Sequence, residues 1–123
     1  MKSIIKNGKV IGKNFEHQKY LDIYIENGVI CKIGEKLEEE GAEIFNGEGK
    51  YVLPGFIDMH CNICDPGYEY IEDIETAPCS AAKGGFTSIT CEPNTNPTID
   101  NKTVVEYIVS KSKEYSLVHI YPY

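Results

Sequence analysis

The spacing of apolar residues divides the chain into two parts with different periodicity. Over residues 1–53, short runs alternate between apolar and polar side chains and are separated by Asn-Gly pairs, a pattern typical of β-hairpins. After Gly67, short β-branched runs are separated by longer segments with helical spacing, which indicates alternating strands and helices. The sequence therefore predicts a small β-domain over residues 1–53 and a strand–helix domain over residues 54–123.

Turn residues and apolar runs place the individual elements. In the first part we expect a hairpin over residues 4–11 with its turn at Asn7-Gly8, a polar loop over 12–19, a second hairpin over 21–33 with its turn at Asn27-Gly28, and short strands over 42–45 and 50–53. In the second part we expect a buried strand within 53–67, a helix from Thr76 as N-cap to Gly84-Gly85, a strand over 86–91, a helix from Asp100 or Asn101 to about Tyr115, and a strand over 117–121.

The strand within residues 53–67 carries the candidate chemistry. Side chains on a strand point to alternate faces. Strict alternation places a polar row on one face (Asp58, His60, Asn62 and Cys64) and a packing row on the other (Ile57, Met59, Cys61 and Ile63). Potential ligands that run toward the C-terminal end of a strand are typical of the active-site edge of a parallel α/β sheet or barrel.

Four sequence blocks occur here in the order found in one known family. They are Gly55-Phe56-Ile57-Asp58-Met59-His60, Asp65-Pro66-Gly67-Tyr68-Glu69-Tyr70 with Glu72-Asp73-Ile74-Glu75-Thr76, Gly84-Gly85-Phe86-Thr87, and Pro93-Asn94-Thr95-Asn96-Pro97. In these blocks the chain resembles dihydroorotases, the pyrimidine-pathway members of the cyclic amidohydrolase superfamily. Hydantoinases and allantoinases share the first block, whereas the second and fourth blocks favour dihydroorotase.

The resemblance also marks departures at the ligand positions. Where the family has His-x-His-x-Arg, this chain has His60-Cys61-Asn62-Ile63-Cys64. The resemblance implies that His60 binds one ion of a zinc pair, with Asn62 in place of the second histidine. It also implies that Asn94 contacts the substrate, with Cys64 in place of the arginine that grips the substrate carboxylate. Glu92 stands where a methionine usually precedes Pro-Asn-Thr, and no catalytic residue is expected within this chain.

Length limits what the chain can contain. A closed (β/α)8 barrel needs roughly 250 residues, whereas this chain has 123. The resemblance places the bridging carboxylated lysine, two further metal-binding histidines and the proton-moving aspartate beyond Tyr123. The expected fold class is therefore α/β, with residues 1–53 as part of a small β-sandwich. Residues 54–123 are expected to form the first three strands and two helices of an incomplete TIM barrel. The expected partner is the missing barrel half or a second copy of the chain.

Composition and charge indicate which partners and which cellular compartment to expect. A net charge of -7 and a sequence pI near 4.9 argue against nucleic acid and anionic membranes, which both select clustered lysine and arginine. The polar N-terminus predicts neither a signal peptide nor a membrane span. Five cysteines at irregular spacing do not form a disulfide framework, so a reducing cytoplasmic location is expected.

Three functions follow from these residues. The first is the N-terminal part of a dihydroorotase-like zinc hydrolase, which catalyses reversible cyclisation of N-carbamoyl-L-aspartate, a small-molecule substrate, to dihydroorotate in pyrimidine biosynthesis. This isolated chain is expected to be inactive. The second is a non-catalytic homologue that serves as an assembly or scaffold subunit. The third is a small metal-binding module that uses His60 with nearby cysteines. Strand spacing argues against the third, because four residues separate His60 from Cys64 by roughly 13 Å.

Overall fold

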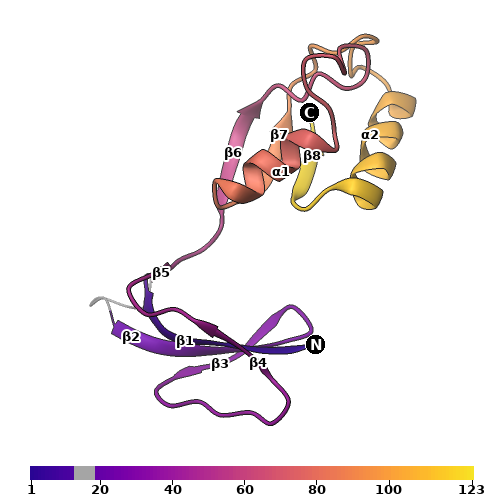
Figure 1. Cartoon of the computed structure of the whole chain (residues 1–123). Helices are drawn as coiled ribbons and strands as arrows, with labels where there is room; N and C mark the ends of the chain where they lie inside the picture. The colour runs from indigo at the N-terminus through magenta and orange to yellow at the C-terminus, as the bar shows by residue number, and fades with distance from the viewer. Residues whose placement is uncertain (13–18) are drawn as a thin grey trace. The chain divides into compact units, whose positions relative to one another are not determined.

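The computed structural model describes residues 1–12 and 19–123, which form two compact units, Met1–Pro54 and Gly55–Tyr123 (Figure 1). Most of the predicted polar loop, residues 13–18, lies outside the described residues. Within the described part of the chain, neither helix is long and apolar enough to cross a membrane. The protein is an α/β protein in which strands alone build the first unit and strands alternate with helices in the second.

The N-terminal unit is one five-stranded sheet. Its strands are β1 (Lys2–Val10), β2 (Lys19–Glu26), β3 (Val29–Gly34), β4 (Glu43–Asn46) and β5 (Tyr51–Val52). The order is β3-β2-β1-β4, and β5 also pairs with β1. Strand β1 is antiparallel to β2 and parallel to β4 and β5. Val10 of β1 and Leu21 and Ile23 of β2 form a small buried apolar cluster.

One of the two predicted hairpins is confirmed and the other is wrong. Strands β2 and β3 form the second hairpin, in which Asn27 and Gly28 have φ angles of 51° and 80°, as a tight turn between antiparallel strands requires. The Asn7-Gly8 pair does not turn the chain, because β1 continues through it. Instead, the register with β2 shifts between Ile5 and Gly8. Asn7, with a φ of 53°, therefore forms a bulge within a strand.

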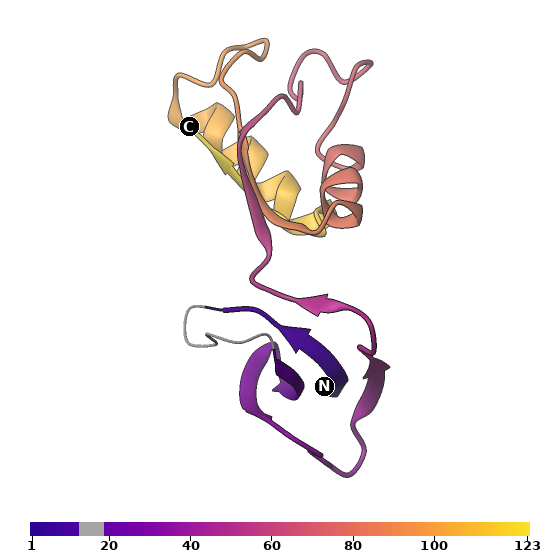
Figure 2. The same cartoon turned by 90° about the vertical axis from the view of Figure 1, so that its left-hand side faces the viewer.

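The C-terminal unit is a parallel three-stranded sheet with two helices. Its elements are β6 (Phe56–Cys61), α1 (Thr76–Lys83), β7 (Phe86–Cys91), α2 (Lys102–Tyr115) and β8 (His119–Pro122), and the strand order is β6-β7-β8. Figure 2 shows the strands and the two helices of this unit in a second view, turned by 90°. The predicted helices and strands of this part are present. However, Glu75 is the N-cap of α1, and Asp73, rather than Thr76, accepts hydrogen bonds from the free N–H groups of its first turn.

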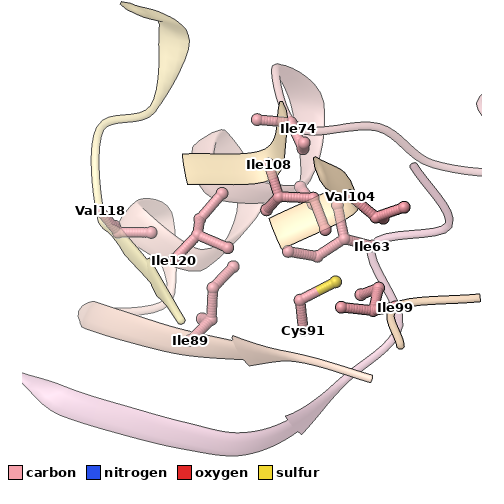
Figure 3. Packing of buried hydrophobic residues seen from close by; sticks show 10 residues of the cluster. Ile63, Ile74, Ile89, Cys91, Ile99, Val104, Ile108, Val118 and Ile120 are labelled. Atoms are coloured by element: carbon pink, nitrogen blue, oxygen red, sulfur yellow. The ribbon is translucent and has the colours of Figure 1, made fainter. Parts of the chain in front are cut away.

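A single apolar core joins both helices to one face of the sheet. Ile89 and Cys91 of β7 and Ile120 of β8 pack against Val104 and Ile108 of α2 (Figure 3). The other buried members are Ile63, Ile74, Ala77, Ile99 and Val118. Because the core includes residues from the loops that follow β6 and β7, it also fixes where those loops begin.

The predicted alternation along β6 is wrong. Ile57 and Met59, two members of the predicted packing row, are 64% and 74% exposed, so little of the described chain covers them. Asp58 is the register partner of Ile89, and Cys61 is the partner of Cys91, so β6 contains one residue more than β7 over this interval. The extra residue breaks the two-residue period, and the strand ends at Cys61.

The core predicts a contrast between two isoleucines of this segment. Ile63→Ala removes a side chain with no exposed surface and is expected to lower the free energy of unfolding by about 2–5 kcal/mol. Ile57→Ala, at an exposed position, is expected to change it by about 0.5 kcal/mol or less. Urea denaturation of both variants measures the difference, and equal losses would show that the two positions are equally packed.

Candidate functional site

The candidate site lies at the carboxyl edge of the parallel sheet. Parallel strands end at the same edge, and the three strands here end at Cys61, Cys91 and Pro122. Polar residues stand within three positions of each end: His60 and Asn62 for β6, Glu92 and Asn94 for β7, and Tyr123 for β8. The loops that follow β6 and β7 and the last residue of the chain lie at this end of the unit (Figure 1).

His60 and Glu92 form the central contact. His60 Nδ1 lies 3.1 Å from Glu92 Oε1, and the Tyr123 hydroxyl donates a hydrogen bond to the same carboxylate oxygen. The hydrogen bond to Glu92 raises the pKa of the Tyr123 hydroxyl, so this phenol remains a donor at neutral pH. The His60 side chain is 77% exposed, whereas the Glu92 side chain is only 18% exposed. The imidazole therefore presents its other nitrogen, Nε2, at an open edge.

Asn62 and Asn94 form a second contact between the same two loops. The Asn94 amide Nδ2 donates a hydrogen bond to Asn62 Oδ1. A carbonyl oxygen has two lone pairs, so Asn62 keeps one acceptor site. The structure therefore brings together three of the predicted site residues, His60, Asn62 and Asn94, through contacts between the ends of β6 and β7.

The remaining members of the predicted polar row lie differently. The Asp58 carboxylate accepts a hydrogen bond of 2.9 Å from the backbone N–H of His60, so this side-chain contact lies within β6. Cys64 lies in the loop after β6 with a φ of 66°, and its thiol is 3.9 Å from the carbonyl oxygen of Asn62. The expectation that four residues share one face of a strand fails because β6 ends before Asn62.

Two cysteines of this unit, Cys61 and Cys91, are poor metal ligands. Burial raises the pKa of Cys61 and raises that of Cys91 to about 11, so both remain protonated thiols at neutral pH. Both also pack in the apolar core. Within the described residues, no group of three or more His, Cys, Asp or Glu side chains is placed to hold a metal ion.

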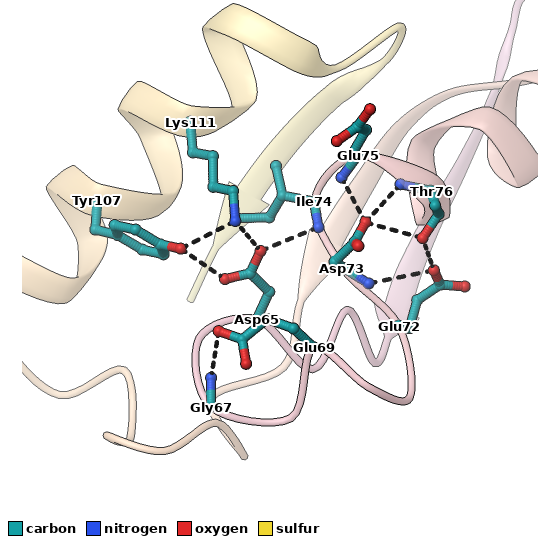
Figure 4. Close-up of polar contacts among 10 residues, drawn as sticks. All are labelled: Asp65, Gly67, Glu69, Glu72, Asp73, Ile74, Glu75, Thr76, Tyr107 and Lys111. Carbon is teal, nitrogen blue, oxygen red and sulfur yellow. Dashed lines mark hydrogen bonds and ion pairs between the residues drawn. The ribbon is translucent and has the colours of Figure 1, made fainter.

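The loop after β6 is anchored to α2 by a buried carboxylate. Asp65 has no exposed surface, and its Oδ2 accepts hydrogen bonds from Lys111 Nζ at 2.7 Å and from the Ile74 backbone N–H at 3.2 Å (Figure 4). Its Oδ1 accepts from the Tyr107 hydroxyl at 2.9 Å. The hydrogen bond to Asp65 raises the pKa of Lys111. Sequence reasoning missed this cluster, whose only local signal is the spacing of Tyr107 and Lys111 on one helix face.

A close backbone approach ties the same loop to the one after β7. Gly67 has a φ of 101°, and a Cβ added there would lie 2.1 Å from the carbonyl oxygen of Asn96. The Asn96 N–H donates to the carbonyl oxygen of Pro66 at 3.0 Å. Only glycine fits this position, because it combines an unusual φ with no space for a side chain. The loops after β6 and β7 are thus held together at two points, by the Asn94–Asn62 hydrogen bond and by the backbone contact of Asn96 with Pro66 and Gly67.

These observations define an α/β protein with imidazole, amide, carboxylate and phenol groups gathered at the carboxyl edge of a parallel sheet. The model of the dihydro-orotase-like family matches residues 49–123. The chain is 50% identical over 119 residues to a dihydroorotase of Acetivibrio thermocellus, covering 97% of this chain and 28% of that protein. It is 46% identical over 122 residues to a dihydroorotase of Ruminiclostridium cellulolyticum, covering 99% of this chain and 28% of that protein.

A solved structure supports the same placement. The crystal structure of a D-hydantoinase matches with a TM-score of 0.82 and 32% identity, covering 99% of this chain and 26% of that chain. The chain belongs to the dihydro-orotase-like family. It spans less than a third of the length of these relatives.

The Asp65 anchor predicts a large difference between two lysines of α2. Lys111→Met leaves a buried carboxylate without its counter-ion and is expected to cost about 3–5 kcal/mol of unfolding free energy. The control is Lys102→Met, which removes an exposed pair with Glu106 and is expected to cost about 0.5 kcal/mol or less. Denaturant unfolding at neutral pH compares the two variants, and similar costs would contradict an anchoring role.

The same pair predicts a pH dependence. Because the pKa of Lys111 is raised in the folded protein, its contribution to stability is complete below the pKa of an unfolded lysine, about 10.4, and falls as pH rises through the folded value. The stability difference between wild type and Lys111→Met should therefore shrink in strongly alkaline buffer. A constant difference would contradict this linkage.

Proposed function

We propose that this chain is the N-terminal part of a dihydroorotase-like hydrolase that interconverts N-carbamoyl-L-aspartate and dihydroorotate in pyrimidine biosynthesis. The observation that carries the proposal is the position of His60 at the carboxyl edge of a parallel sheet, in a chain whose relatives are named dihydroorotases. Because those relatives are more than three times longer, the chain would supply one part of the catalytic unit and would be inactive alone.

The proposed architecture assigns residues 1–53 to part of a small β-sandwich and residues 54–123 to the first three strands and two helices of a (β/α)8 barrel. The parallel β6-β7-β8 sheet with both helices on one face supports this assignment. The exposed apolar side chains of Ile57 and Met59 also support it, because further elements would cover them. The missing barrel half, or a second copy of this chain, is the proposed partner.

The donor set fits one edge of a zinc site. His60 Nε2 is a suitable zinc ligand, and Asn62 Oδ1 is a weaker one that already accepts a hydrogen bond from Asn94. Since no described cluster holds three ligands, the other ligands would come from polypeptide outside this chain. When bound, zinc supplies Lewis acidity toward a carbonyl and lowers the pKa of bound water.

The residues of this chain would bind and orient the substrate. The Asn94 amide can donate a hydrogen bond to a substrate carboxylate, and its hydrogen bond to Asn62 holds that amide against the loop after β6. Orientation of this kind contributes to rate by holding reacting groups in one geometry. Cys64 brings no positive charge to the position where the family has an arginine, so carboxylate binding would be weaker than in a bidentate arginine pair.

The second candidate is a non-catalytic homologue that acts as a scaffold or assembly subunit. Its support is specific: Asn62 Oδ1 already accepts a hydrogen bond from Asn94, and Cys64 lies in a loop and carries no positive charge. A protein kept for assembly needs the folded surface but neither the second histidine nor the arginine.

Zinc content and ring opening of dihydroorotate, measured together on the protein purified from its native gene, separate the two candidates. The enzyme predicts stoichiometric zinc and turnover, both reduced by at least about 10–100-fold in His60→Ala. His119→Ala, an exposed histidine of β8, is the matched control and should leave both unchanged. Absence of zinc and of turnover in the wild type would reject the enzyme and support the scaffold.

A gain-of-function variant sharpens this test. In the protein purified from its native gene, Asn62→His together with Cys64→Arg restores an imidazole ligand and a carboxylate-binding cation. This double variant is expected to raise kcat/KM by at least about tenfold if the remaining machinery is intact. Steady-state kinetics with dihydroorotate measure the change. An unchanged kcat/KM would indicate that the geometry around these positions no longer supports the reaction.

A further inference from the structure

Glu92 is the residue of the site for which the proposed function gives no role. Its carboxylate oxygen Oε1 lies 3.1 Å from His60 Nδ1. The contact joins the ends of two neighbouring strands. His60 is the second-last residue of β6, and Glu92 is the first residue after β7. It is therefore a contact between neighbouring strand ends rather than one made by chance along a flexible segment.

Contacts other than the one with His60 also restrain Glu92. The Glu92 backbone N–H donates to the carbonyl oxygen of Cys61 at 3.0 Å, which fixes the residue beside the end of β6. The Tyr123 hydroxyl donates to Glu92 Oε1, and the Tyr123 N–H donates to the carbonyl oxygen of Cys91 at 3.4 Å. Glu92 is thus bound from both sides along the sheet edge, and its side chain is mostly buried.

An acceptor at Nδ1 decides which nitrogen of a neutral imidazole carries the proton. A carboxylate accepts hydrogen bonds and cannot donate, so its position 3.1 Å from Nδ1 favours the tautomer in which Nδ1 carries the proton. Nε2 then keeps its lone pair and, because the His60 side chain is 77% exposed, presents it to solvent. A histidine oriented by a carboxylate through one nitrogen is the usual arrangement in which the other nitrogen binds a metal.

We propose that Glu92, supported by Tyr123, is a positioning residue that holds His60 as the Nδ1–H tautomer with Nε2 free as an acceptor. The proposal rests on the proposed function only for the identity of what Nε2 binds, a divalent transition metal. The orientation itself is a property of three residues in this chain and does not depend on the rest of a barrel.

The alternative is that the His60–Glu92 contact is an exposed ion pair that does not set the tautomer of His60. Pairs in which both side chains are solvated contribute little, because water competes for each partner. Here only the histidine is exposed, and the carboxylate is restrained by a hydroxyl and by its backbone. A restrained acceptor can set a tautomer even where it adds little to overall stability, so the tautomer is the readout to measure.

Heteronuclear NMR of isotopically labelled histidine in the full 123-residue chain tests the proposal. In alkaline buffer, where imidazoles are neutral, the wild-type His60 signal should report a proton on Nδ1 and a lone pair on Nε2. In Glu92→Met, which removes the acceptor, the signal should shift to the Nε2–H form or to a mixture. Tyr123→Phe should produce a smaller shift in the same direction. His119 provides the internal control, and His60→Gln assigns the His60 signal.

Titration with zinc ion alone gives the second readout. If the tautomer is as proposed, zinc affinity at His60 should fall by about 10–100-fold in Glu92→Met. A wild-type Nδ1–H tautomer that disappears in Glu92→Met supports the positioning role even if no zinc binds, an outcome that would count against the proposed metal function alone. A wild-type Nε2–H tautomer, or one unchanged in Glu92→Met, overturns the proposal whatever zinc does.

Discussion

The buried carboxylate of Asp65 is the constraint on which the C-terminal unit depends. A charge without exposed surface is tolerated only when it is paired and hydrogen-bonded, and here Lys111, Tyr107 and the Ile74 N–H meet that need together. The Lys111 contact spans 46 positions in the sequence, so it joins the loop after β6 to the far turn of α2. The loop that begins with Asn62 therefore cannot shift without exposing or unpairing this charge.

That anchor gives the sheet edge its geometry. With the loop after β6 held at Asp65 and held again where Gly67 meets Asn96, the polar residues at the strand ends face one another across a short distance. Asn62 and Glu92, two positions that the resemblance marks as departures, each make a side-chain contact across this edge. Asn62 accepts from Asn94, and Glu92 contacts His60.

The surfaces left open point to the same incomplete unit. Within the described residues, β6 and β8 each pair with β7 alone, so both outer strands present unpaired backbone groups. Ile57 and Met59 lie exposed on β6, and exposed apolar groups beside a free strand edge are typical of an interface. Both features agree with the proposal that further polypeptide covers this sheet. The polar sheet edge, by contrast, is already organised by contacts internal to the chain.

The sequence by itself determined the α/β class, the hairpin at Asn27-Gly28, both helices and the family, because these depend on local periodicity, turn chemistry and contiguous motifs. Tertiary structure alone decided that Asn7-Gly8 forms a bulge, that an extra residue breaks the alternation of β6, and that Glu92 meets His60. Each of these depends on the register between strands or on contacts between distant residues. A single sequence carries no signal for such pairings, since the hydrogen-bond partner that settles each one lies elsewhere in the chain.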